Sequence, residues 1–153
     1  MTNQEIFNVV SRGMLGTLRK STTTHYKHNT TCNAYIGDDG NRCGLGMLIP
    51  PHIGISKSLN TLRIIQPETI EFFTRHNIIS KEQSYLCTTT MCLLAKLQAA
   101  HDFYYVLDWY DILVRIAQEF DLNPPQQVVP SSDTLAICHS INVVKHVSLP
   151  NLH

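Results

Sequence analysis

The residues best suited to chemistry lie in two short stretches of the chain. The first, CNAYIGDDGNRCGLGMLIP, runs from Cys32 to Pro50 and holds two cysteines, four glycines and an Asp-Asp-Gly turn. The second, LQAAHD, carries Gln98, His101 and Asp102. These residue types can build a metal site, a cysteine nucleophile with a histidine base, or a cradle for a small ligand.

A metal site would take Cys32 and Cys43 as thiolate ligands together with His101. Ten residues separate the two cysteines, whereas structural zinc sites usually present pairs such as Cys-x-x-Cys, which this chain lacks. Cys87 and Cys92 have a spacing that does not align them on one helix face. Free cysteines are among the most often buried residue types, so we expect buried thiols and no metal or cofactor. A small zinc-binding interaction module stays an alternative.

A cysteine hydrolase would use Cys43 as the nucleophile and His101 as the base. Cys43 precedes Gly-Leu-Gly, where a helix can begin, and a helix N-terminus lowers the pKa of a thiol. The base also needs a third group to orient it. Neighbouring helical residues point about 100° apart, so we expect Asp102 not to orient His101. The hydrolase is therefore kept as the alternative, and a non-enzymatic protein is expected.

The glycines of the first stretch indicate a cradle, because exposed backbone N–H groups in succession favour anions. Known phosphate-binding fingerprints do not match the stretch. Tyr35 could stack on a base, and Arg42 could bind a phosphate through two parallel hydrogen bonds. Gln98, His101 and Asp102 form a polar row on one helix face, which can face a pocket, face water or bond the turn.

A pocket of this kind requires the two stretches to lie side by side, and the expected ligand is a small nucleotide-like molecule. The residues expected to bind it are Tyr35, Gly37, Gly40, Arg42, Cys43, Gly44, Gly46, Gln98, His101 and Asp102. The same glycines would also suit a turn that only packs against the helix, so both interpretations stay open.

An amphipathic helix opens the chain, because Thr2 and Glu5 fit a capping box ahead of apolar residues at four-residue spacing. Those apolar residues are Ile6, Val10, Met14 and Leu18. Residues 19–31 have no apolar period and predict an exposed basic loop. Residues 32–48 predict a small β-hairpin around GDDGN, since Gly and Asp tolerate positive φ.

Three more helices are predicted after residues 52–66, which indicate short helix and loop. Pro67 suits the first position of a helix ending near Asn77. Ser80 and Gln83 fit a second capping box, and the helix after it breaks within HDFYYVLD. The apolar faces of the last two helices are formed by Leu93, Leu97, Ala100 and Tyr104, and by Trp109, Leu113, Ile116 and Phe120.

These patterns predict an α+β fold, a compact and mainly helical domain with a small β-hairpin. Its last helix, which Asp108 can cap, ends where two prolines follow. The length of 153 residues suits one domain, which we expect over residues 1–125. Residues 126–153 are rich in β-branched side chains and predict a C-terminal extension that adds strands or binds a partner.

Charged residues make up only 16% of the chain, and the net charge is zero. Nucleic-acid binding relies on many Lys and Arg contacts to phosphates, so it is not expected here. No stretch approaches the roughly 20 apolar residues of a membrane span, and no secretory signal pattern opens the chain. An odd number of cysteines, five, then predicts a cytoplasmic protein. The apolar C-terminal residues favour a protein partner or a homo-oligomer.

Two fragments, YIGDDGNRCGLGMLIP and LLAKLQAAHDFYYVLDWYDILVRIAQEFDL, together resemble a family of small, largely uncharacterised proteins encoded by bacteria and their phages. That family has a Tyr-x-Gly-x-x-Gly-x-x-Cys-x-x-Gly-x-Leu-Ile-Pro run followed by Leu-Gln-x-x-His-Asp, and the match covers roughly residues 3–122. The resemblance implies a bacterial or host-cell cytoplasm and no settled activity. Small phage proteins often act on host components, including immune signalling. We therefore expect a phage-type binding protein that counteracts host defence by sequestering a nucleotide-derived signal or by blocking a host protein.

Overall fold

The computed structural model describes residues 1–25 and 30–126, except for the side chains of residues 25 and 30–32. Four α-helices lie in these ranges: α1 (Asn3–Thr17), α2 (Pro67–Arg75), α3 (Thr89–Phe103) and α4 (Trp109–Glu119). The described part also has two 3₁₀ helices, η1 (Leu45–Leu48) and η2 (Val106–Asp108), and two strands, β1 (Thr22–His25) and β2 (Thr30–Asn33). The predicted mainly helical character is confirmed.

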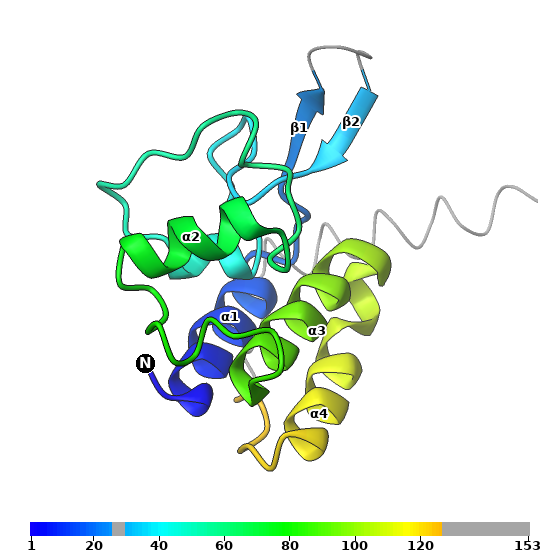
Figure 1. Cartoon of the computed structure of the whole chain (residues 1–153). Coiled ribbons are helices and arrows are strands. Elements are labelled where there is room, and N and C mark those ends of the chain that lie inside the picture. Colours follow the sequence, from blue (N-terminus) through cyan, green and yellow to red (C-terminus); the bar gives the residue numbers. More distant parts are fainter. Residues whose placement is uncertain (26–29, 127–153) are drawn as a thin grey trace, which may run out of the picture.

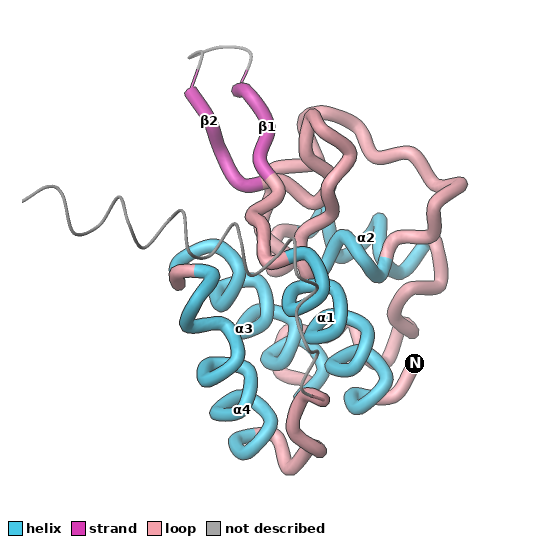
Figure 2. Tube along the Cα trace, turned by 180° about the vertical axis from the view of Figure 1, so that it is seen from behind, coloured by secondary structure: helices cyan, strands magenta, loops and turns pink. Residues whose placement is uncertain are grey.

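Helices α1, α3 and α4 pack against one another, and the strand pair projects from one end of this group (Figure 1). The turn that follows β2 leads into η1, which packs on both α1 and α3. The helix α2 lies to one side among long loops, as the view from behind shows (Figure 2). The core is therefore helical, and the first chemistry-bearing stretch lies directly against it. The largest fully buried side chains of the core include Trp109, Tyr35, Phe7 and Phe73.

The first helix forms as its capping box and apolar stripe predict. The Thr2 side chain accepts a hydrogen bond from the Glu5 backbone N–H (3.2 Å), and the Glu5 carboxylate accepts one from the Thr2 backbone N–H (2.7 Å). Ile6, Val10 and Met14 are buried. Leu18 belongs instead to the helix end, where it adopts the left-handed conformation with φ 47°.

The strands lie elsewhere than the sequence predicted. Residues 19–31, predicted as an exposed loop, contain β1 and the first part of β2, which pair antiparallel with Thr22 opposite Asn33. Threonine is β-branched and favours strands. The strands were not predicted because these residues include no alternating apolar side chains. The hairpin predicted at residues 32–48 is not formed, because its arms are joined only by an isolated bridge between Ile36 and Arg42. The chain then enters η1 rather than a second strand.

The third helix begins later than its predicted capping box. Ser80 and Gln83 do bond each other's backbone N–H groups, at 2.9 and 3.2 Å, but only turns follow them. Thr88 caps the helix instead, by accepting a hydrogen bond from the Met91 backbone N–H (3.2 Å). Asp108 does occupy the cap position of α4, but its side chain makes no capping bond.

The faces of the last two helices are largely as predicted. Leu93, Leu97 and Ala100 are buried on α3, and so are the first three residues of the stripe predicted for α4. Tyr104 is 44% exposed, because α3 ends before it. Phe120 is only partly buried at the C-terminal end of α4.

Two other predictions fall on loops or outside the described residues. Residues 52–66 contain turns and no helix, since their apolar residues follow no helical period. The C-terminal extension predicted over residues 126–153 lies outside the description from residue 127 onward, and so do the strands expected there. Within residues 1–25 and 30–126, no helix has the length and apolar character to span a membrane.

Candidate ligand site

The two chemistry-bearing stretches meet at one cavity. It has a volume of about 210 Å³ and lies between the turn after β2, the loop of residues 60–63 and the C-terminal end of α3. Tyr35 and Cys43 from the first stretch line it together with Gln98 and Asp102 from the second. A smaller hollow of about 100 Å³ shares part of this lining and extends along α3. The predicted proximity of the two stretches is confirmed.

Tyr35 forms a buried wall of the cavity. Its side chain is 1% exposed, and its ring lies 5.8 Å from that of Phe73. The hydroxyl oxygen accepts a hydrogen bond from Gln98 Nε2 (3.4 Å), and burial raises the pKa of Tyr35 well above its usual value. The ring is therefore held by the core, which differs from the exposed stacking platform that the sequence suggested.

Gln98 and Asn60 fix the loops around the cavity to its walls. Gln98 Oε1 accepts a hydrogen bond from the Ile64 backbone N–H (2.7 Å). The Asn60 side chain accepts a hydrogen bond from the Ile36 N–H (2.9 Å) and donates one to the Ile36 carbonyl (2.7 Å). Asn60 escaped prediction because it lies in the aperiodic segment, where nothing in the sequence distinguishes a bonding amide from a solvated one.

The glycines of the turn have structural uses. The Gly37 N–H donates to the Asn41 carbonyl (2.7 Å) and the Gly40 N–H to the Gly37 carbonyl (3.0 Å), with Gly40 at φ 79°. The Gly46 N–H donates to the Cys43 sulfur at 3.2 Å. These three N–H groups are engaged inside the protein, so they do not form the open anion cradle predicted from the sequence.

Gly44 and Gly46 allow close packing of the turn. A Cβ atom at Gly44 would lie 2.7 Å from a methyl carbon of Val10 on α1. A Cβ atom at Gly46 would overlap the backbone carbonyl of Tyr35. Of the two interpretations left open by the sequence, the packing role describes these positions.

Arg42 binds backbone carbonyls. Its Nη1 atom donates to the carbonyl oxygens of Gly46 (2.9 Å), within η1, and of Ile49 (2.5 Å), just after it. The side chain therefore fastens the turn to η1. It does not lie in the lining of the cavity, so the phosphate contact expected of Arg42 finds no support in its position.

His101 is buried, and both of its ring nitrogens have partners. The Ser21 backbone N–H donates to Nε2 (3.3 Å), so the proton of the neutral ring sits on Nδ1, which donates to Asp102 Oδ1 (2.9 Å). The ring also stacks on Trp109, with centroids 5.4 Å apart. The expectation that Asp102 does not orient His101 was wrong, because the two side chains meet in this hydrogen bond even though they are neighbours on α3.

The end of α3 also binds both strands. Lys20 Nζ, just before β1, donates to the backbone carbonyl oxygen of Asp102 at 2.8 Å. Asn33, at the end of β2, donates to the same oxygen through its side-chain amide at 3.5 Å. Positive charge near a helix C-terminus is favourable, so the Lys20 contact stabilises the end of α3 beside the cavity.

Cys43 is not an activated nucleophile. Burial raises the pKa of its thiol to about 12, and the negative charge of Asp102 adds to this effect. No hydrogen bond joins its sulfur to His101 among the described residues. A cysteine hydrolase needs a thiol next to its base, and this geometry gives the hydrolase alternative no support.

We expect Cys43 to resist alkylation in the folded protein. At about pH 8, iodoacetamide should modify the exposed Cys87 and Cys92 while Cys43 stays unmodified, because the neutral, buried thiol is a poor nucleophile. Peptide mass mapping of native and denatured samples checks this, and the denatured chain should be alkylated at Cys43 too. Rapid modification of native Cys43 would reinstate the hydrolase.

The zinc alternative rests partly on a side chain outside the description. Within the described residues, no group of three or more His, Cys, Asp or Glu side chains is placed to hold a metal ion. The side chain of Cys32, one of the three proposed ligands, is not described. Both nitrogens of His101, another of them, are already hydrogen-bonded within the protein.

Two residues that the sequence did not single out complete the mouth of the cavity. The Phe103 side chain is 69% exposed, and the Arg63 guanidinium lies over its ring, 5.8 Å from the centroid.

In comparisons with known proteins, no family model, curated protein or solved structure matches this chain. The cavity and its lining are therefore the features of this chain that bear on its function.

Proposed function

We propose that this chain is a non-enzymatic binding protein that holds a nucleotide-derived small molecule in the cavity beside Tyr35. The observation that carries the proposal is the meeting of the two sequence motifs at one hollow. Tyr35 and Gln98, 63 positions apart, contact each other there, and Cys43 and Asp102 complete the same lining. Concave sites with a few convergent polar groups are the usual places for small ligands.

The size of the cavity limits what enters it. Drug-sized ligands usually occupy roughly 300–1,000 Å³, and this cavity has about 210 Å³. It therefore suits one ring system, such as a nucleobase, with the rest of the ligand outside. The exposed Phe103 ring at the mouth offers an aromatic face, which favours a flat ligand.

Binding without catalysis fits the chemistry of the lining. The Cys43 thiol is neutral and is not hydrogen-bonded to a base among the described residues, so it contributes to the shape of the cavity and does not act as a nucleophile. In the phage setting that the family resemblance implies, tight capture of a nucleotide-derived signal would keep it from a host defence system. Sequestration of this kind needs only affinity and enough protein.

We expect at least one ligand from a panel of nucleoside monophosphates, ADP-ribose and cyclic dinucleotides to raise Tm by about 5 °C or more near saturation. Thr61→Trp should abolish the shift, because Thr61 lines the cavity and the indole would fill it. Ser58→Trp, at an exposed position of the same loop, should leave it unchanged. Absence of any shift, together with native mass spectra free of nucleotide, would contradict the proposal.

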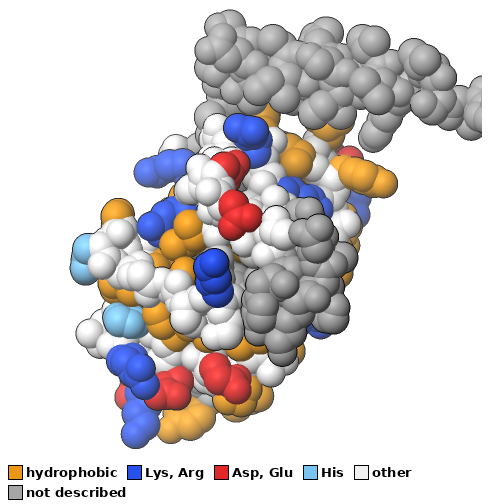
Figure 3. Space-filling model, turned by 90° about the horizontal axis from the view of Figure 1, so that it is seen from above, with side chains coloured by type: hydrophobic (Ala, Val, Ile, Leu, Met, Phe, Trp, Pro, Cys, Tyr) orange, Lys and Arg blue, Asp and Glu red, His pale blue; other side chains and the backbone are white. Residues whose placement is uncertain are grey.

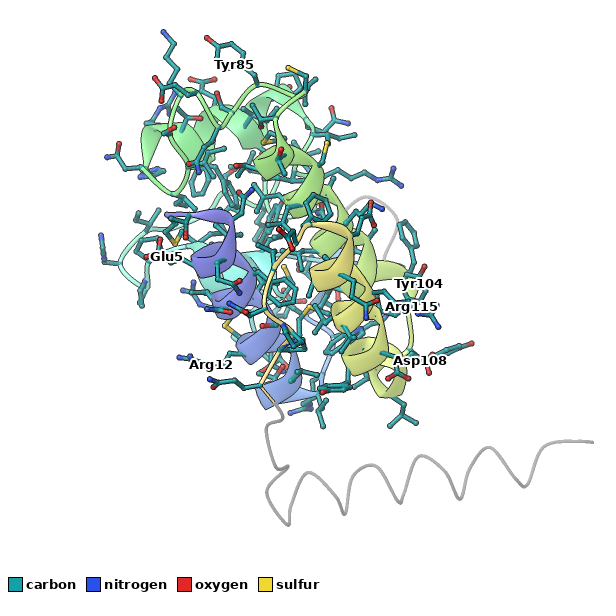
Figure 4. The ribbon with its side chains drawn as sticks, turned by 90° about the horizontal axis from the view of Figure 1, so that it is seen from below. Glu5, Arg12, Tyr85, Tyr104, Asp108 and Arg115 are labelled. Atoms are coloured by element: carbon teal, nitrogen blue, oxygen red, sulfur yellow. The ribbon has the colours of Figure 1, made fainter. Side chains whose placement is uncertain are left out.

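A second candidate, the blocking of a host protein, is favoured by exposed aromatic side chains at the end of α3 and just after it. Phe103 and Tyr105 are 69% and 70% exposed, and Tyr104 and Leu107 are exposed beside them. Figure 4 labels Tyr104 and Asp108 in this region, and Figure 3 shows that the face seen from above carries hydrophobic side chains interspersed with charged ones of both signs. Such surfaces often mark protein contacts. If the protein blocks a host protein, the Thr61→Trp variant should still support phage infection of a defended host. If the protein sequesters a nucleotide, the variant should no longer do so.

A further inference from the structure

Two opposite charges line the cavity without pairing with each other. Asp102 and Arg63 both line the cavity and the adjoining hollow, and no ion pair joins them within residues 1–25 and 30–126. The Lys20 ammonium binds the backbone carbonyl of Asp102 rather than its carboxylate. A ligand carrying hydrogen-bond donors at one end and negative charge at the other would satisfy both side chains.

The Asp102 carboxylate presents an acceptor to the cavity. Its side chain is 18% exposed, Oδ1 accepts a hydrogen bond from His101, and Oδ2 receives none from the described residues. An ionised carboxylate only accepts hydrogen bonds, and it binds best to two N–H groups side by side. Because His101 holds one oxygen in place, the orientation of the carboxylate is fixed before any ligand arrives.

Guanine has the edge that such an acceptor requires. Its ring N1–H and exocyclic amino group are adjacent donors, whereas the corresponding edge of adenine places an acceptor nitrogen beside its amino group. A carboxylate would repel that acceptor. The Phe103 ring offers a face for a base, and base–aromatic stacking contributes about 1–3 kcal/mol. The planar fork of Arg63 matches a phosphate group.

We propose that the cavity recognises guanine nucleotides, with Asp102 accepting the N1–H and exocyclic amino donors of the base and Arg63 binding the phosphate. This inference rests on the proposed function and names its ligand class. The base fills the ring-sized hollow, and the phosphate stays at the mouth, where the guanidinium is exposed.

Calorimetric titration of the full chain with guanosine, inosine and adenosine monophosphates tests the base contact. Guanosine monophosphate should bind about ten-fold more tightly than the inosine compound, which lacks the exocyclic amino group. Asp102→Asn should remove this preference and keep the fold, because the amide oxygen can still accept from His101. Asp111→Asn, an exposed position on α4, is the matched control and should keep the preference.

The phosphate contact is tested separately with guanosine. Wild-type protein should bind guanosine monophosphate about ten-fold more tightly than guanosine, and Arg63→Gln should bring the two affinities close together. Arg115→Gln, at an exposed position on α4 that Figure 4 labels, should leave the difference unchanged. Melting curves without ligand confirm that each variant is folded.

The outcomes separate this inference from the proposed function. Nucleotide binding at the cavity without a preference for guanine would overturn the inference and leave the proposed function standing. Binding of free amino acids, whose ammonium and carboxylate groups also match Asp102 and Arg63, would overturn both, and so would binding of nothing in the panel. A guanine preference lost in Asp102→Asn and kept in Asp111→Asn would support it.

Discussion

Replacing Gly46 with alanine should lower the free energy of unfolding by about 3 kcal/mol or more. The added Cβ atom would overlap the carbonyl oxygen of Tyr35 and lie 2.8 Å from its carbonyl carbon. Both atoms belong to the backbone, so no side-chain rotation can relieve the overlap. The same carbonyl accepts a hydrogen bond from the Cys43 N–H (2.9 Å), and separating the two segments would break it.

Urea denaturation followed by circular dichroism measures this loss, with Gly16→Ala as the matched control. Gly16 lies in α1, and a Cβ atom there would meet nothing within 4 Å. That substitution should raise the free energy of unfolding by about 0.5–1 kcal/mol, since alanine favours a helix over glycine. Equal stability of Gly46→Ala and wild type would mean that the turn does not pack as closely on Tyr35 as described.

Replacing His101 with leucine should cost about 3 kcal/mol of folding stability. Leucine keeps an apolar group against Trp109 but removes the acceptor of the Ser21 N–H and the donor to Asp102. A buried donor without a partner costs about 1–3 kcal/mol, and groups that bond a charge cost more. The loss therefore comes from two unsatisfied partners and not from a cavity.

His52→Leu is the control for this second substitution, because His52 is exposed and should tolerate leucine within about 0.5 kcal/mol. Both variants are compared by urea midpoint and by nucleotide affinity. If His101→Leu were as stable as wild type but bound no ligand, His101 would act on the ligand directly, and its structural role would be wrong.

The helices could be predicted where the signal is local. The capping box at Thr2 and the apolar stripe that starts at Trp109 each operate within a few turns of one helix, and both predictions hold. The start of α3 was missed because the complete capping box at Ser80 and Gln83 precedes only turns, whereas Thr88, eight residues later, caps the helix through a single hydrogen bond. Only the packing of the following residues decides which of them begins a helix.

The site was predicted in part. The meeting of the turn with LQAAHD followed from two motifs rich in polar groups, and the contact between Tyr35 and Gln98 bears it out. The use of the glycines could not be predicted, because an open N–H and a close backbone approach both require glycine. Arg63 and Phe103 were missed, because their side chains become neighbours only through the tertiary fold.

The contacts of Lys20 and Asn33 with the end of α3 connect the projecting strand pair to one wall of the cavity. Lys20, just before β1, and Asn33, at the end of β2, both donate to the backbone carbonyl of Asp102, a residue that lines the cavity. Free-energy coupling between two sites is reciprocal. If the cavity binds the proposed ligand, a molecule that tilts the strand pair should change that affinity, and the ligand should change the affinity of the strand pair for that molecule by the same factor.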